Sequence, residues 1–298
     1  MSKIVYDNHE EEWDRVLHDP ERQKVGNSWL RDDTLDYWRH ARMREPLNTI
    51  ISNDPDAKWL TIGDGRFGTD ASYIQKAGAK SVHCTDISDK LLKEAASKGI
   101  ISEFSAQNAE SLTFENESFD YVYCKESFHH FPRPYLALYE MFRVARKAII
   151  ITEPRDANVD VTLFSMLKRF IKKSILKRNS DSHMYEPVGN YLYSISEREI
   201  EKFLLGMNYP HVAYHGCNDA YVEGVEFVGQ DSDSPEDIII KDKLYASIKK
   251  LDNLTKWGIS RSNIITAALF KEVPDKKLQE GMAVAGWKYK RLPSNPYK

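Results

Sequence analysis

Apolar segments of strand length alternate with helical segments between residues 58 and 152 of this 298-residue chain. Strands are expected at 58–62, 81–85, 100–104, 118–124 and 147–152, and helices at 69–77, 88–99 and 134–145. Strands that alternate with helices pair in parallel, and right-handed crossovers place the helices on both faces of the sheet. The alternation therefore predicts a doubly wound α/β fold.

The first of these strands runs directly into a turn with three glycines, Gly63-Asp64-Gly65-Arg66-Phe67-Gly68. Glycine lets the backbone turn sharply and approach a ligand closely, with its N–H groups directed at an anion. Asp86 follows at the end of the second strand, where a carboxylate can accept hydrogen bonds from ribose hydroxyls. The arrangement suits a nicotinamide dinucleotide, through its pyrophosphate, and S-adenosylmethionine, through its methionine carboxylate. The turn alone leaves both cofactors open.

Topology predicts where such a ligand binds. In an open α/β sheet the site lies beyond the carboxyl ends of the strands, at the point where strand order reverses. The turn after the first strand and the segment Lys125–Phe131 after the fourth strand are both expected at this point. We therefore expect one crevice with the glycine turn on one side and this segment on the other.

The chain from Trp59 to Pro154 resembles the class I S-adenosylmethionine-dependent methyltransferases, in particular the type 11 small-molecule group. The motif residues that stand in register are Asn108-Ala109-Glu110, Leu112-Thr113-Phe114, Ser118-Phe119-Asp120, His129-His130-Phe131, Pro134 and Glu140 with Arg143-Val144. The resemblance implies S-adenosylmethionine as the cofactor. It also implies a Rossmann-like doubly wound sheet of seven strands, mostly parallel with an antiparallel last strand, to which this chain adds a helical N-terminal leader and inserted helices.

The same resemblance assigns a set of residues to the cofactor. The glycine turn would hold its methionine end, Asp86 its ribose hydroxyls, and the residues after the second and third strands its adenine. The predicted cofactor-binding residues are Gly63, Asp64, Gly65, Asp86, Ile87, Asn108, Ala109 and Lys125. The chain departs from the family pattern in four places. Thr61 replaces the usual acidic residue, Phe67 stands where the third glycine usually falls, and Asn108 replaces the usual Asp. The pair of glycines that usually follows Arg143-Val144 is missing.

Two adjacent histidines, His129 and His130, are the candidate catalytic residues. A hydroxyl acceptor must lose a proton during methyl transfer, and a positioned histidine is the commonest base. An amine acceptor needs no strong base, so either histidine can instead pack the turn. Glu126 is expected to orient a histidine or to bind a substrate hydroxyl, or else to lie solvated at the sheet edge.

The insertion after the fifth strand offers candidate acceptor-binding groups. The candidates are Tyr185, Glu186, Asn190 and Tyr191. Aromatic and polar side chains of this kind can stack on polyhydroxylated molecules and hydrogen-bond to them. Before these residues, a basic amphipathic helix carries the charged face Lys168–Arg178. This face either lies in water while the helix packs on the domain, or contacts an anionic substrate or an anionic membrane surface.

Charge and cysteine content exclude several classes of function. A net charge of −3 gives no basic field for nucleic acid, and the charged N-terminus is no secretory signal. Cys84, Cys124 and Cys217 are far apart and form no CxxC pair, which indicates reduced thiols and a cytoplasmic protein. We expect no metal, because the segment after the fourth strand offers a single acidic ligand.

These observations predict five consecutive regions of the chain. They are a helical leader or lid (1–57), the cofactor-binding half of the methyltransferase domain (58–154), an inserted basic helix and acceptor loop (155–194), the rest of the domain (195–273) and an extended tail (274–298). The predicted function is methyl transfer to a hydroxyl or amine of a small molecule, such as a sugar or surface-glycan precursor. The alternatives are an NAD(P)-dependent oxidoreductase and a non-catalytic S-adenosylmethionine-binding protein.

Overall fold

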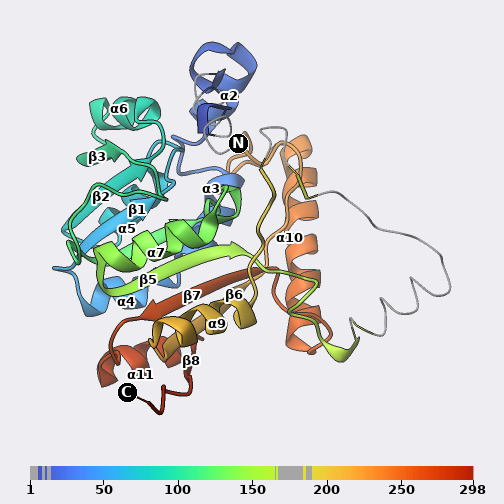
Figure 1. Ribbon diagram of the computed structural model, residues 1–298. Helices are drawn as coiled ribbons and strands as arrows, with labels where there is room; N and C mark the ends of the chain where they lie inside the picture. The colour runs from blue at the N-terminus through green and yellow to red at the C-terminus, as the bar shows by residue number, and fades with distance from the viewer. Residues whose placement is uncertain are drawn as a thin grey trace.

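The computed structural model describes residues 6–8, 11, 15–164, 166, 184–185 and 190–297. These residues form an eight-stranded sheet in the order β3-β2-β1-β4-β5-β7-β6-β8 (Figure 1). The strands are β1 (Lys58–Ile62), β2 (Ser81–Asp86), β3 (Glu103–Ala106), β4 (Phe119–Lys125), β5 (Ala145–Pro154), β6 (His211–Cys217), β7 (Ile264–Phe270) and β8 (Lys288–Arg291). Strands β1 to β5 pair in parallel, and β7 is antiparallel to both β5 and β6. The predicted doubly wound sheet with an antiparallel seventh strand is therefore confirmed.

Helices cover both faces of this sheet (Figure 1). They are α2 (Pro20–Ser28), α3 (Leu35–Arg44), α4 (Leu47–Asn53), α5 (Thr69–Lys76), α6 (Lys90–Ser97), the short 3₁₀ helix η1 (Phe128–His130), α7 (Pro134–Val144), α9 (Glu197–Met207), α10 (Pro235–Lys256) and α11 (Lys276–Val284). Neighbouring strand residues point to opposite faces, so Trp59 packs with α4, α5, α6 and α11, whereas Leu60 packs with α7 and α9. The two apolar clusters are the core of the domain.

The C-terminal tail corrects one expectation from the sequence, which predicted an extended segment after residue 274. The tail folds into α11 and β8, and β8 pairs with β6 as an eighth strand. Asp275 begins the helix by accepting a hydrogen bond from the backbone N–H of Leu278 (2.8 Å). Met282 and Trp287 are buried in the core, and the indole of Trp287 donates to the carbonyl of Pro46 (3.3 Å). Burial of this apolar face explains why the tail is ordered.

The leader helix α3 packs against distant parts of the chain, namely the segment after β6 and α10. Leu35 packs in a third apolar cluster with residues of the segment after β6 and of α10. The backbone N–H groups of Leu35 and Asp36 donate to the carbonyls of Val228 (2.9 Å) and Val225 (3.2 Å). This attachment places α3 across the carboxyl end of β4, where the site lies.

Two sequence predictions fall outside the described residues. They concern the basic face Lys168–Arg178 and the candidate substrate-binding residue Glu186. Within the described ranges, no helix combines the length and the apolar character that a membrane span requires.

Candidate functional site

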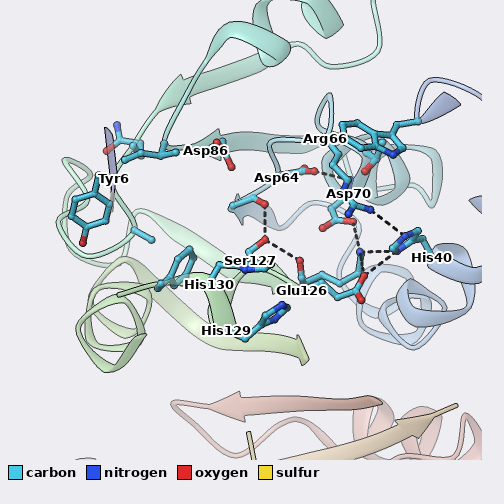
Figure 2. A pocket seen from close by; sticks show the side chains of 18 of the residues that line it. Tyr6, His40, Asp64, Arg66, Asp70, Asp86, Glu126, Ser127, His129 and His130 are labelled. Carbon is cyan, nitrogen blue, oxygen red and sulfur yellow. Dashed lines mark hydrogen bonds and ion pairs between the residues drawn. The ribbon is translucent and has the colours of Figure 1, made fainter. Parts of the chain in front are cut away.

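A cavity of about 850 Å³ lies at the carboxyl ends of β1, β2 and β4. Its walls are the turn after β1, the end of β2, the segment after β4 and residues of the leader. Figure 2 shows Tyr6 at one end of the cavity and His40 at the other, with Asp86 and Ser127 between them. The predicted convergence of the two turns on one crevice is confirmed.

Ser127 joins the two turns directly. Its hydroxyl donates to the carbonyl oxygen of Gly63 (2.6 Å). Gly63 has φ of +70°, and a Cβ atom there would lie 2.5 Å from the Cβ of Ser127. Glycine is therefore required at this position both for its conformation and for the close approach.

Seven of the eight predicted cofactor-binding residues line the cavity: Gly63, Asp64, Asp86, Ile87, Asn108, Ala109 and Lys125. Gly65 is not among the lining residues, because it lies on the buried side of the turn. Asp86 is buried at the end of β2 and accepts a hydrogen bond from the backbone N–H of Ser88 (3.1 Å). The roles of these residues toward a cofactor stay predictions.

The carboxylate of Asp64 turns toward the beginning of α5. Its oxygens accept from the backbone N–H groups of Asp70 (3.1 Å) and Ala71 (2.8 Å) and from the hydroxyl of Thr61 (3.0 Å). Burial, and next the carboxylate of Asp70, raise the pKa of Asp64 to about 7. Thr61, which replaces the usual acidic residue of the family, therefore serves as a hydrogen-bond donor to an acidic residue three positions later.

A buried charged cluster of Lys125, Glu126 and His40 forms the end of the cavity next to α3. The ammonium of Lys125 lies 3.1 Å from Glu126 and 3.2 Å from Nδ1 of His40, which is itself 3.0 Å from Glu126. Although burial acts in the opposite direction, Lys125 and His40 hold the pKa of Glu126 well below its usual value. Burial and the charge of Lys125 lower the pKa of His40, which favours a neutral imidazole. Glu126 also has φ of +49°, an uncommon conformation for a residue other than glycine.

His129 is held by a carboxylate that sequence analysis missed. Glu153, at the end of β5, is fully buried and accepts from the backbone N–H groups of Ser127 (3.0 Å) and Phe128 (2.9 Å). Its other oxygen pairs with Nδ1 of His129. Because Nδ1 is engaged by Glu153, His129 would exchange a proton through its other ring nitrogen, Nε2. A signal was present, since an acidic residue at the end of the fifth strand reaches the same sheet edge as the residues after the fourth.

His130 also lines the cavity, and its ring centroid is 4.0 Å from that of His129. Both rings lie on the Ser127 side of the cavity in Figure 2. The predicted pair of histidines is thus at the site, but the ion pair with Glu153 distinguishes His129 from its neighbour.

The described part of the predicted acceptor loop does not line the cavity. Tyr185 and Tyr191 are exposed and pack edge to face with ring centroids 5.4 Å apart, and Asn190 is buried. The loop packs behind the histidines, where the backbone N–H of Tyr193 donates to the carbonyl of His129 (3.1 Å). Substrate binding by Tyr185, Asn190 and Tyr191 stays a prediction, and so does that by Glu126, which does line the cavity.

The sequence predicted a helical leader or lid over residues 1–57, but not which of its residues line the cavity. Asp36, Arg39 and His40 line the cavity from α3, together with Tyr221 from the segment after β6. The guanidinium of Arg39 donates to Asp36 (2.8 Å) and to Asp219 (3.0 Å), which ties α3 to that segment. The available signal for these residues was the unusually large number of charged residues on a helix that also has a buried face.

Comparisons with known proteins identify the central part of the chain. The family model described as "Methyltransferase domain" matches residues 60–151. Among curated proteins, none matches this sequence. Two similar solved structures are a SAM-dependent methyltransferase from Thermotoga maritima (14% identity, 91% of this chain and 100% of that chain, TM-score 0.46) and magnesium protoporphyrin IX methyltransferase from Synechocystis (17% identity, 90% and 99%, TM-score 0.47).

Proposed function

We propose that this chain transfers a methyl group from S-adenosylmethionine to a hydroxyl group of a small molecule, since its residues 60–151 match the model of the methyltransferase domain. The pair formed by His129 and Glu153 at the cavity is the observation that supports a hydroxyl acceptor.

The residues around the cavity suit this donor. Gly63 lets the backbone pass close to a bound molecule, the carboxylate of Asp86 suits ribose hydroxyls, and the side chain of Ile87 suits a flat apolar base. Asn108 and Ala109 complete that end of the cavity. When bound, S-adenosylmethionine supplies a methyl carbon made electrophilic by its sulfonium sulfur. The chain then contributes chiefly by holding the acceptor oxygen in line with that carbon.

His129 removes the proton that a hydroxyl acceptor loses. Its Nε2 accepts the proton as the oxygen forms its bond to the methyl carbon, and the carbon–sulfur electron pair stays on sulfur. Glu153 stabilises the protonated imidazole and keeps its orientation, as a buried carboxylate does in other histidine bases. An amine acceptor would not need this pair of residues, and that favours oxygen.

The acceptor side of the cavity is rich in hydrogen-bonding groups. Asp36, Arg39, Glu126 and Tyr221 line it, which suits a polyhydroxylated acceptor such as a sugar or a surface-glycan precursor. Nucleic acid is a poor acceptor for a chain with a net charge of −3. The cytoplasm is the compartment that suits its three free cysteines.

Turnover with matched acceptors tests this function. The protein is incubated with S-adenosylmethionine and with pairs of nucleotide-sugars that differ by a hydroxyl or an amino group, and mass spectrometry follows S-adenosylhomocysteine and the methylated product. We expect an O-methylated product and a loss of about 100-fold or more in kcat for His129→Gln. His130→Gln is the matched control and keeps most of the activity. An N-methylated product, or full turnover by His129→Gln, would contradict the proposal.

A further inference from the structure

The backbone N–H groups at the beginning of α5 are already used by the protein itself. The family resemblance suggests that the glycine turn presents N–H groups to the methionine carboxylate of the donor. In this chain Asp64, a residue of that turn, accepts from the backbone N–H groups of Asp70 and Ala71 at the beginning of α5. These two N–H groups are therefore not available to a carboxylate of the ligand.

Arg66, two residues after Asp64 in the same turn, has the chemistry for this task. Its side chain is exposed to the cavity that it lines, and its guanidinium lies 5.0 Å from the ring centroid of Trp29. One guanidinium nitrogen lies 3.4 Å from Nε2 of His40. Throughout the described ranges, no carboxylate forms an ion pair with Arg66, whereas buried Lys125 already contacts Glu126 and His40. A planar guanidinium suits a carboxylate because it offers two parallel N–H groups.

The neighbours of Arg66 fix its position before any ligand arrives. The Nε2 atom of His40 lies 3.4 Å from the guanidinium nitrogen of Arg66 and 3.6 Å from Oδ1 of Asp36, while its Nδ1 faces Lys125 and Glu126. Trp29 supplies a flat ring on which the cation rests. Figure 2 shows Arg66 and His40 at the end of the cavity opposite Tyr6, with Asp86 between the two ends. A donor with its ribose at Asp86 and its adenine toward Asn108 would extend its tail toward Arg66.

We infer that Arg66, positioned by Trp29 and His40, binds the α-carboxylate of the methyl donor. This inference rests on the proposed function, since it concerns the donor of that reaction. It adds Arg66 of the glycine turn to the site, together with Trp29 and His40 of the leader.

Binding of two ligands that differ only in this carboxylate tests the inference. Isothermal titration calorimetry compares S-adenosylmethionine with its decarboxylated form, for the unchanged protein and for Arg66→Gln. We expect Arg66→Gln to weaken S-adenosylmethionine at least about tenfold, as for the loss of hydrogen bonds to a charged group. Affinity for the decarboxylated form should stay within about twofold, as for a surface substitution elsewhere.

Three further variants sharpen the comparison. Arg66→Lys keeps the charge and is expected to recover part of the affinity, whereas Trp29→Leu keeps Arg66 but removes its support and should weaken only the carboxylated ligand. Arg261→Gln removes a half-exposed arginine outside the cavity wall and should change neither affinity. Equal weakening of both ligands by Arg66→Gln, or no weakening, would overturn the inference. Failure of the unchanged protein to bind either ligand would instead overturn the proposed function.

Discussion

The hydroxyl of Ser127 donates to the carbonyl oxygen of Gly63 across 2.6 Å and thereby connects the turn after β1 with the turn after β4. These two turns are separated by three strands and two helices in the sequence. A side chain at position 63 would clash with Ser127, so this hydrogen bond requires a glycine at that position. The importance of this contact can be tested by substitution.

Gly63→Ala is expected to destabilise the fold and to abolish binding of S-adenosylhomocysteine. The substitution adds a strained φ of +70° and a clash with Ser127, and strain of this kind costs about 1–3 kcal/mol in the free energy of unfolding. Gly99→Ala is the matched control, because Gly99 has the same φ of +70° but open space around it. Urea unfolding of both variants separates the clash from the backbone strain. Equal losses of stability would show that the contact with Ser127 is unimportant.

Glu153→Gln is expected to lower kcat with little change in KM, because it removes the charge that stabilises protonated His129. The same loss makes His129 release its proton more readily, so the acidic limb of the kcat profile should move to lower pH. Glu201→Gln is the control, since Glu201 lies on α9 outside the cavity wall and pairs with Lys290 of β8 (2.6 Å). An unmoved pH profile with reduced stability would assign Glu153 a structural role only.

Asp64 is expected to make stability fall as pH rises from about 4 to about 7. Its pKa rises from 3.8 to about 7 on folding, so the folded state holds a proton that the unfolded state has lost in this window. Asparagine cannot titrate. As pH rises, the free energy of unfolding of Asp64→Asn should therefore increase relative to that of the unchanged protein, by about 1.4 kcal/mol for each unit by which folding raises the pKa of Asp64. Urea unfolding at pH 5 and pH 8 measures the difference. Asp70 and Glu126, whose pKa values are lowered, act in the opposite direction but are common to both proteins. Parallel pH dependences of the two proteins would contradict this assignment.

At position 67 we expect glycine to give a more stable protein than alanine, which reverses the usual order of the two residues. It has φ of +57°, is buried, and packs edge to face on Trp29 with ring centroids 6.5 Å apart. Both Phe67→Ala and Phe67→Gly lose this packing, but only glycine relieves the backbone strain. We expect Phe67→Gly to be the more stable variant by about 1 kcal/mol in thermal unfolding. Greater stability of Phe67→Ala would mean that the backbone relaxes when the ring is removed.

The alternation of apolar strand segments with helical segments was enough to predict the sheet. The charged contacts of the site could be found only from the tertiary structure. Strands β1, β2, β4 and β5 begin and end within about two residues of their predictions, because apolar runs bounded by turns locate strands well. The third strand begins at Glu103 rather than at Ile100, because Ile101 is used to pack against the glycine turn. The apolar run was visible in the sequence, but its packing partner was not.

Within the site, the sequence indicated which segments meet but not which side chains pair. The ends of parallel strands share one edge, so the approach of Gly63 to the segment after β4 was predictable. The pairing of His129 with Glu153, and the approach of His40 to Arg66, depend on side-chain geometry across separate elements. A single sequence does not encode such pairs as a spacing, and this is why Glu153 and Arg66 were missed.

The attachment of α3 to Val225 and Val228 has a consequence for synthesis on the ribosome. The wall that bears Asp36, Arg39 and His40 is translated before β1, yet its anchoring partners are translated only after β6. A nascent chain that has just completed β5 holds every strand of the parallel half, but the segment that fixes this wall has yet to be made. The binding cavity is thus completed late in translation, well after the sheet that underlies it.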